Sequence, residues 1–149
     1  MKKFLFDCGT RDLTASFGLF VLRVSIGLMM MLGHGIVKIQ NFDKLKAEWL
    51  VPDFFPLKYM SHPVSLMATI GAEVVAAGLI VLGLATRPAA FVLAFAMVIA
   101  AFDQLGPQPF AVKELALMYL VGSVVILLTG AGTWSLDAAI LKEKKRRGW

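Results

Sequence analysis

Four long apolar stretches alternate with shorter polar segments along the chain. The stretches cover about residues 15–37, 64–84, 88–104 and 110–129. A helix needs roughly 17 to 25 mostly apolar residues to cross the hydrocarbon core of a membrane, so each stretch is long enough for one crossing. Transmembrane strands are not indicated, because the stretches are continuously apolar and do not alternate. The pattern predicts an all-α fold, an integral membrane four-helix bundle that forms a single domain over residues 1–149.

The connections between the predicted spans differ in length. The last three spans are joined by "ATRP" and "LGPQP", which contain turn-favouring residues, and Pro88 suits a first helical position. Such tight connections predict that these spans are antiparallel neighbours. The first connection is longer, and in "NFDKLKAEWL" the residues Phe42, Leu45 and Trp49 recur at helical spacing among charges. This spacing predicts a short interfacial helix on the membrane surface, followed by the Pro-broken loop "VPDFFPLKYMSHP".

The composition supports a membrane protein and excludes several other classes. Of 149 residues, 58% are hydrophobic, which is more apolar surface than one small soluble core can bury. The net charge of +5 comes largely from residues that flank the apolar stretches, where they set topology, so no nucleic-acid partner is expected. Cys8 is the single cysteine, which excludes an internal disulfide and any metal site built from cysteines.

The distribution of basic residues predicts the orientation. If both termini are cytoplasmic, the cytoplasmic flanks hold nine basic residues and the outer flanks hold five, as the positive-inside rule requires. The C-terminal segment "WSLDAAILKEKKRRGW" begins with a helix cap at Ser135 and ends in a basic run. It predicts a basic surface helix that is attracted to anionic lipid. We therefore expect a multi-pass protein of the cell membrane, in a bacterium the inner membrane, with the lipid bilayer as its first partner.

Two ionisable residues lie deep within the predicted spans. At 1.5 Å per residue, Arg23 is about 12 Å and Glu73 about 16 Å from the same membrane boundary. An unpaired arginine at that depth costs at least about 2.5 to 3.5 kcal/mol, so we predict an ion pair between the two residues. Its purpose stays open. The small residues of "GAEVVAAG" favour close helix packing, whereas intramembrane charges more often mark a site or pathway.

A second polar group is expected at the opposite side of the membrane. His34 follows Arg23 by eleven residues, which on an ideal helix is the same face about three turns further on, and Lys38 lies one more turn along. Asp103 ends the third span and Glu114 lies near the start of the fourth, so these side chains share one layer. Histidine titrates near neutrality, and a carboxylate neighbour would tune it for proton transfer beside a redox molecule. The alternative is a set of separate interfacial residues that face water or headgroups.

These considerations define the candidate site. A metal is not expected, because neither HxxE nor HxxxH spacing occurs. The candidate catalytic residues are His34 and Glu114, and the candidate pocket residues are Arg23, Glu73, Lys38 and Asp103.

Three segments together resemble the DoxX family of small four-span membrane proteins, which includes the DoxD subunit of thiosulfate:quinone oxidoreductase. They are "LRVSIGLMMMLGHGIVKI", "GAEVVAAGLIVLGLATRPAAFVLAFAMVIA" and "KELALMYLVGSVVILLTGAGTWSLDA". The order is specific: an arginine, then HGxxK, a glutamate in a small-residue helix, GLxTR, and GxGxxSLD. The resemblance covers Leu22 to about Ala138. The residues on motif positions are Arg23, His34, Lys38, Glu73, Arg87 and Glu114, whereas Asp103 is included only by the spatial argument.

The resemblance implies a four-helix membrane bundle associated with electron transfer from sulfur compounds or thiols towards quinone, and with oxidative-stress defence. The leading hypothesis is a membrane subunit of such a redox system, with quinone as the candidate cofactor and a soluble or periplasmic redox partner. Two alternatives stay open, a non-catalytic membrane anchor or assembly partner and a small carrier that would need an oligomer because it has few spans. Whether the protein is itself an enzyme is not determined by these motifs.

Overall fold

Helices form all the regular structure in the part of the chain that the computed structural model describes. That part comprises residues 9, 12–53 and 55–146, without the side chains of 143–146. No strand occurs in these residues, so the all-α prediction is confirmed. The α-helices are α2 (Leu13–Met30), α3 (Ile36–Gln40), α4 (Phe42–Leu45), α5 (His62–Ile70), α6 (Ala77–Leu82), α7 (Thr86–Val98), α8 (Phe110–Thr129) and α9 (Leu136–Arg146). Three π-helical segments, η1 (Met31–Gly35), η3 (Gly71–Ala76) and η4 (Ile99–Gln104), and one 3-10 turn, η2 (Leu57–Tyr59), complete the set.

These elements join into four continuous helices that are long and apolar enough to cross a membrane. They run over Leu13–Gln40, His62–Leu82, Thr86–Gln104 and Phe110–Thr129. The four-span prediction is confirmed, although the first helix extends beyond the predicted limits at both ends. The third helix begins earlier than predicted, so Pro88 is its third residue and not its first. Pro88 still costs no intrahelical hydrogen bond there, because the first four N–H groups of a helix have no partner within it.

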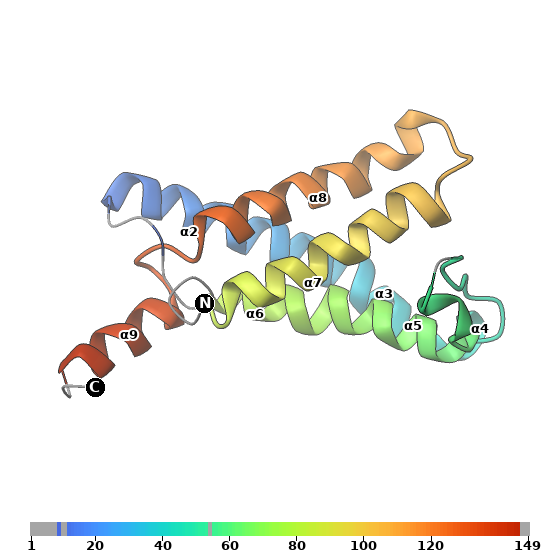
Figure 1. Ribbon diagram of the computed structural model, residues 1–149, viewed down its shortest axis with the longest axis horizontal. Coiled ribbons are helices and arrows are strands. Elements are labelled where there is room, and N and C mark those ends of the chain that lie inside the picture. The colour runs from blue at the N-terminus through green and yellow to red at the C-terminus, as the bar shows by residue number, and fades with distance from the viewer. Residues whose placement is uncertain (1–8, 10–11, 54, 147–149) are drawn as a thin grey trace.

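The spans pack in pairs around a core of small side chains. α7 runs beside α8, and α2 beside α6 (Figure 1). Alanines such as Ala77 and Ala90 are fully buried between them, together with Leu93 and Ile126. Small residues let helix backbones approach closely, which is how membrane helices gain packing energy without a hydrophobic drive between them. Many large apolar side chains point outward instead, as expected for faces that meet lipid.

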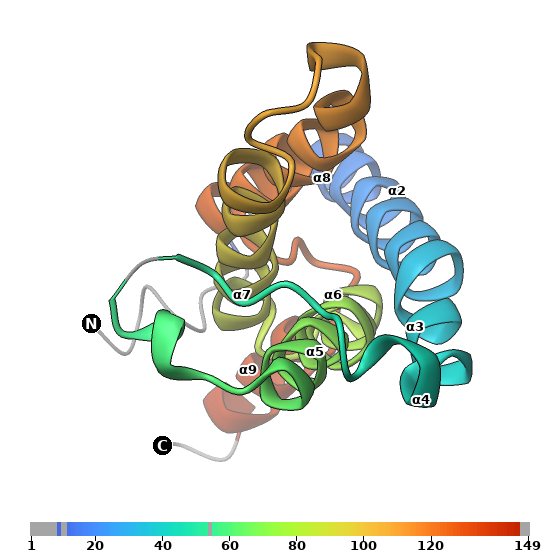
Figure 2. The same cartoon turned by 90° about the vertical axis from the view of Figure 1, so that its right-hand side faces the viewer.

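The bundle has two distinct ends. At the cavity end, which we define by residues 41–61 and the end of η4, the connection between α3 and α5 crosses the spans (Figure 2). α4 is shorter than the predicted interfacial helix, because Trp49 lies beyond its end in an irregular segment. The tail end holds the turn between α6 and α7 and the helix α9. The cytoplasmic termini and the membrane-surface position of α4 and α9 stay predictions, and Cys8 lies outside the described residues.

Arg23 lies at the tail end and does not pair with Glu73, so that predicted ion pair is wrong. Its guanidinium donates hydrogen bonds to the carbonyl oxygens of Ile80 at 2.8 Å, Val81 at 3.2 Å and Trp134 at 2.6 Å. Helical side chains lean toward the N-terminus of their helix, so the guanidinium lies nearer the tail end than the Arg23 backbone does. There it meets the last carbonyls of α6, which have no partner within that helix. Arg23 is therefore a structural residue that closes the end of a span.

Asp137 caps the start of α7 by accepting hydrogen bonds from the backbone N–H groups there. Its carboxylate accepts hydrogen bonds from the backbone N–H of Ala85 at 2.9 Å and from the N–H and hydroxyl of Thr86 at 3.0 and 2.9 Å. In return, the backbone N–H of Asp137 donates to the carbonyl of Gly83 at 2.8 Å. Gly83 adopts φ +68°, which a residue with a side chain rarely adopts. The segments that carry the motifs GLxTR and GxGxxSLD are thus hydrogen-bonded to each other at the tail end.

Candidate functional site

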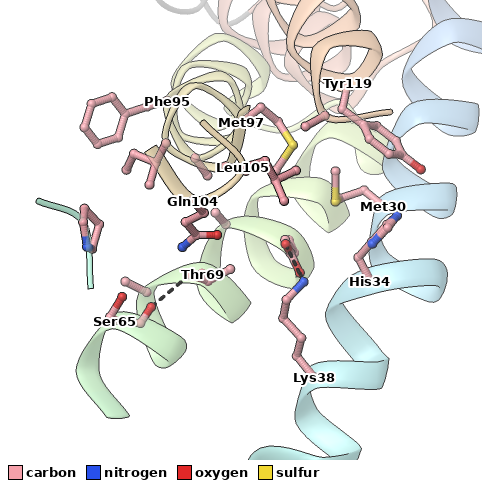
Figure 3. A pocket seen from close by; sticks show the side chains of 18 of the residues that line it. Met30, His34, Lys38, Ser65, Thr69, Phe95, Met97, Gln104, Leu105 and Tyr119 are labelled. Carbon is pink, nitrogen blue, oxygen red and sulfur yellow. Dashed lines mark hydrogen bonds and ion pairs between the residues drawn. The ribbon is translucent and has the colours of Figure 1, made fainter. Parts of the chain in front are cut away.

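A cavity of about 440 Å³ lies toward the cavity end (Figure 3). This volume is within the range of small-molecule sites. The cavity is lined by all four spans and, from the connecting segment, by Trp49, Pro52, Leu57 and Met60. Most of the wall is apolar, with Met30, Met97, Phe95 and Leu105 among its side chains. The polar and charged residues on the wall are few, and they are His34, Lys38, Trp49, Ser65, Thr69, Glu73, Gln104 and Tyr119. An apolar cavity with a few convergent polar groups is typical of a ligand site.

The charged pair in the cavity joins Lys38 to Glu73. The Lys38 ammonium donates to both carboxylate oxygens of Glu73, at 2.6 and 2.8 Å. The side chains are 17% and 6% exposed. The Lys38 side chain leans toward the N-terminus of its helix and so reaches Glu73. The partner of Glu73 is therefore Lys38 and not the predicted Arg23. The same ammonium lies 5.6 Å from the centre of the Trp49 ring, within cation–π range.

His34 and Tyr119 form the second polar feature of the wall. Their rings meet edge to face, with centroids 5.7 Å apart (Figure 3). Within the part of the chain that the structure describes, neither side chain makes a hydrogen bond to the protein. Tyr119 is buried and His34 is half-buried. The imidazole nitrogens and the phenolic hydroxyl are therefore available to a ligand or to water, and both groups can carry a proton.

Three spans change from α- to π-helical geometry where they line the cavity. η1 carries His34, η3 carries Glu73, and η4 ends at Gln104. A π-helical turn bonds residue i to i+5, so it rotates the following side chains relative to an ideal α-helix and releases backbone groups. Such segments are rare and occur often at functional sites. The sequence pattern does not indicate them, because a continuously apolar stretch looks the same whether a turn is α- or π-helical.

Gly35 explains how η1 comes close enough to η3 for the ion pair. A Cβ atom at Gly35 would lie 2.5 Å from Cγ2 of Val74 and 3.1 Å from the backbone carbonyl of Glu73. Gly33, two residues earlier, has open space around the same position. The HGxxK motif therefore combines a cavity-lining histidine, a glycine that permits close helix contact, and the lysine that reaches the glutamate.

The structure separates the candidate residues into two groups. His34, Lys38 and Glu73 meet at the cavity, while Arg23 is at the tail end. Asp103 is half-buried beside the cavity end and accepts from the backbone N–H of Asp53 at 3.3 and 3.4 Å, without lining the cavity. Glu114 is exposed and does not line it either.

Five polar residues of the cavity wall were not site candidates on sequence grounds, namely Trp49, Ser65, Thr69, Gln104 and Tyr119. Tyr119 carried no signal, because a lone tyrosine in an apolar span is typical of packing. Trp49 was assigned to the membrane interface from its position among charges. Only the return of the connecting segment over the bundle end places it against Lys38.

Comparison with known proteins identifies a family. The DoxX family model matches residues 18–106 of the 149, which is more than half of the chain. The matched region contains η1, η3 and η4 with His34, Lys38 and Glu73, whereas Tyr119 follows it. No curated protein and no solved structure matches the chain.

Proposed function

Because the chain belongs to the DoxX family and is a multi-pass membrane protein, we propose that it is the membrane subunit of a quinone- or thiol-linked redox system and that its cavity binds quinone. The observation that carries the proposal is the cavity itself, which is apolar, about 440 Å³ in volume and bears few polar groups. A quinone is a flat apolar ring with carbonyl oxygens, and such a wall suits it.

The polar groups match what quinone reduction requires. The reaction adds two electrons and two protons to the ring oxygens and yields a hydroquinone. His34 and Tyr119 are the proton donors in this proposal, since their polar atoms make no hydrogen bond to the described part of the protein and both side chains can carry a proton. The electrons come from a soluble or periplasmic partner that oxidises a thiol or a reduced sulfur compound.

Lys38 and Glu73 support the site without leaving a net charge in it. Their paired charges cancel, so a neutral ring is not forced beside an isolated ion. The pair also joins the first span to the second at the level of His34. In this proposal it orients the wall, and His34 and Tyr119 act on the bound molecule.

The test is a search for the bound molecule combined with a matched pair of variants on α8. The protein is extracted gently and its lipid-soluble ligands are identified by mass spectrometry. Ala116 lines the cavity, whereas Met118 on the same helix is 63% exposed and points away from it. We expect quinone in the wild type and in Met118→Phe and its loss in Ala116→Phe, which places a phenyl ring inside the cavity. Well-folded wild-type protein that contains no quinone and binds none when quinone is added would overturn the proposal.

The same material separates the two alternatives. Both variants are expressed in a deletion strain that is grown under thiol or peroxide stress. If Ala116→Phe restores growth as well as Met118→Phe does, the cavity is dispensable and the result supports the anchor hypothesis. A carrier must instead accumulate a solute in reconstituted vesicles.

A further inference from the structure

The first and fourth spans touch near the middle of the bundle and diverge toward the cavity end. α8 packs against α2 so closely that a Cβ atom at Gly122 would lie 2.7 Å from Cδ1 of Ile26. Beyond Met30, η1 and α3 have no extensive packing against α8 in the described part of the chain. Figures 1 and 2 both show the two spans separating in this direction. We call the space between η1 and α3 on one side and residues 110–119 of α8 on the other the lateral gap.

One face of α8 marks where the cover of the cavity ends. Val112, Leu115, Ala116 and Tyr119 recur at intervals of three and four residues, so they lie along one face of the helix, and all four line the cavity. Ala116 and Tyr119 are buried, whereas Val112 is 50% and Leu115 49% exposed. Because the four residues share a face, this difference shows that no neighbouring element covers the first two turns of that face. The cavity therefore reaches the surface of the protein at the lateral gap.

The gap on the other side of the bundle is bridged. The second and third spans also separate toward the cavity end, where α5 has no extensive packing against α7 or η4 among the described residues. The connecting segment crosses this second gap (Figure 2). The Leu50 carbonyl accepts from the hydroxyl of Ser65 on α5 at 2.8 Å, and the Asp53 N–H donates to the Asp103 carboxylate of η4 at 3.3 and 3.4 Å. No segment of the described chain crosses the lateral gap in this way.

The position of the lateral gap determines what can pass through it. Both of its walls belong to membrane spans, so it faces the hydrocarbon of the bilayer and not bulk water. Leu115 lies about 8 Å from the start of its span at 1.5 Å per residue. The cavity, at about 440 Å³, has the size of a site for a compact molecule and does not enclose a chain of lipid length. Such a chain has to leave the cavity, and the lateral gap gives it an apolar exit.

We propose that the ligand enters the cavity from the bilayer through the lateral gap, and that it is an amphiphile with a polar ring and a long apolar tail. The ring lies beside His34 and Tyr119, and the tail leaves past Val112 and Leu115. The inference rests on the proposed function, because it assigns a ligand class and an entry route to the same cavity. It also accounts for the arrangement of the wall, in which polar groups lie inside and apolar side chains lie at the opening.

Photolabelling of the wild type tests the position of the tail and requires no variant. A benzoquinone whose long tail carries a diazirine is bound to the protein in lipid nanodiscs and irradiated, and the labelled residues are identified by mass spectrometry. We expect labelling within residues 110–119 and 31–40 that excess unlabelled quinone suppresses. Labelling confined to the second gap, where Val92 and Phe95 line the cavity and are also exposed, would overturn the proposed route. Absence of any suppressible labelling of the protein would overturn it as well.

A matched pair of variants on α8 tests the passage of the ligand. Leu115→Trp narrows the lateral gap, whereas Met118→Trp adds the same ring to a residue that is 63% exposed and does not line the cavity. If the ligand has to displace the new ring at the usual cost of overpacking, exchange of radiolabelled long-tailed quinone should slow at least about tenfold in Leu115→Trp. Met118→Trp should exchange it at the wild-type rate. Equal exchange rates in the wild type and both variants would contradict the route.

A second copy of the chain is the competing occupant of the lateral gap. In that case Leu115→Trp should dissociate an oligomer and leave quinone exchange unchanged, which overturns the proposal. The failure of the proposed function is distinguishable from these outcomes. Folded wild-type protein that binds neither long-tailed nor short-tailed benzoquinone contradicts the proposed function itself. If quinone binds and is lost in Ala116→Phe, but its tail labels residues outside the lateral gap, only the route and the position of the tail are contradicted.

Discussion

The ammonium of Lys38 lies 2.6 and 2.8 Å from the two carboxylate oxygens of Glu73, and this buried pair connects the first span to the second. Buried ion pairs contribute little net stability, because desolvation offsets their attraction. Removing only one residue of the pair is nevertheless strongly destabilising, because the other charge is then buried without a partner. Both residues line the cavity, so the pair also lies beside any molecule that the cavity holds.

Breaking the pair on one side should cost far more than removing it altogether. Lys38→Met leaves a buried carboxylate unpaired and should lower the free energy of unfolding by roughly 3 to 5 kcal/mol. Lys38→Met combined with Glu73→Gln should recover most of that loss. The measurement is reversible unfolding in detergent for the wild type, both single variants and the double variant. Additive losses in the double variant would show that the two residues are not energetically coupled.

Adding one methyl group at Gly35 should disturb the same contact through the backbone. Gly35→Ala places Cβ against Val74 and the Glu73 carbonyl, so η1 must move away from η3. We expect a loss of about 1 to 3 kcal/mol in the free energy of unfolding, typical of overpacking, and weaker quinone binding. Gly33→Ala, in the same segment but with open space, is the control and should change neither quantity. Equal behaviour of the two variants would contradict the close approach.

Arg23→Lys, at the tail end, should lower the stability of the protein but leave its ligand affinity unchanged. Lysine keeps the charge but cannot reproduce the planar fork that serves the carbonyls of Ile80, Val81 and Trp134. Losing charge-assisted hydrogen bonds should reduce the free energy of unfolding by roughly 2 to 4 kcal/mol. Folded protein should bind quinone with wild-type affinity, because the cavity lies toward the other end of the bundle. A large affinity loss with unchanged unfolding would indicate that Arg23 acts in the site.

Proton transfer should depend on His34 and not on the carboxylates that lie off the cavity wall. His34→Gln retains hydrogen-bonding capacity but cannot exchange a proton near neutral pH. The rate of reduction of bound quinone by a dithiol, which replaces the electron-donating partner in the assay and is oxidised to a disulfide, should fall about a hundredfold or more, the usual effect of losing a general acid. The rate is followed by quinone absorbance.

Glu114→Gln and Asp103→Asn are the controls for this experiment. Both residues were candidates on sequence grounds, and neither lines the cavity. Both variants should reduce bound quinone at the wild-type rate. A stronger effect from Glu114→Gln than from His34→Gln would reverse the assignment of the proton donor.

Local properties of the chain account for what was predictable. The four spans follow from the length and apolarity of each stretch, which requires no knowledge of its neighbours. His34 and Lys38 were correctly placed in one layer, because residues one turn apart on a helix share a face wherever the helix packs. DoxX membership also follows from the sequence, since the motif order is a property of the chain.

Depth arithmetic failed for Arg23 for a definable reason. It measured both charges from one assumed membrane boundary, whereas the close contact of Gly35 with the Glu73 backbone places Glu73 several turns further along the first span than Arg23. Lys38 is therefore the residue that reaches Glu73, and Arg23 reaches the end of α6.

The sequence by itself determined the number and approximate position of the spans, the membrane class, the family and the residues able to carry charge or protons. Only the tertiary structure decided which of them meet. π-Helical turns rotate side chains relative to an ideal helix, and the connecting segment folds Trp49 back over Lys38. Tyr119 joins His34 because α8 packs beside the first span as well as the third. These contacts join residues far apart in the chain, so no local pattern encodes them.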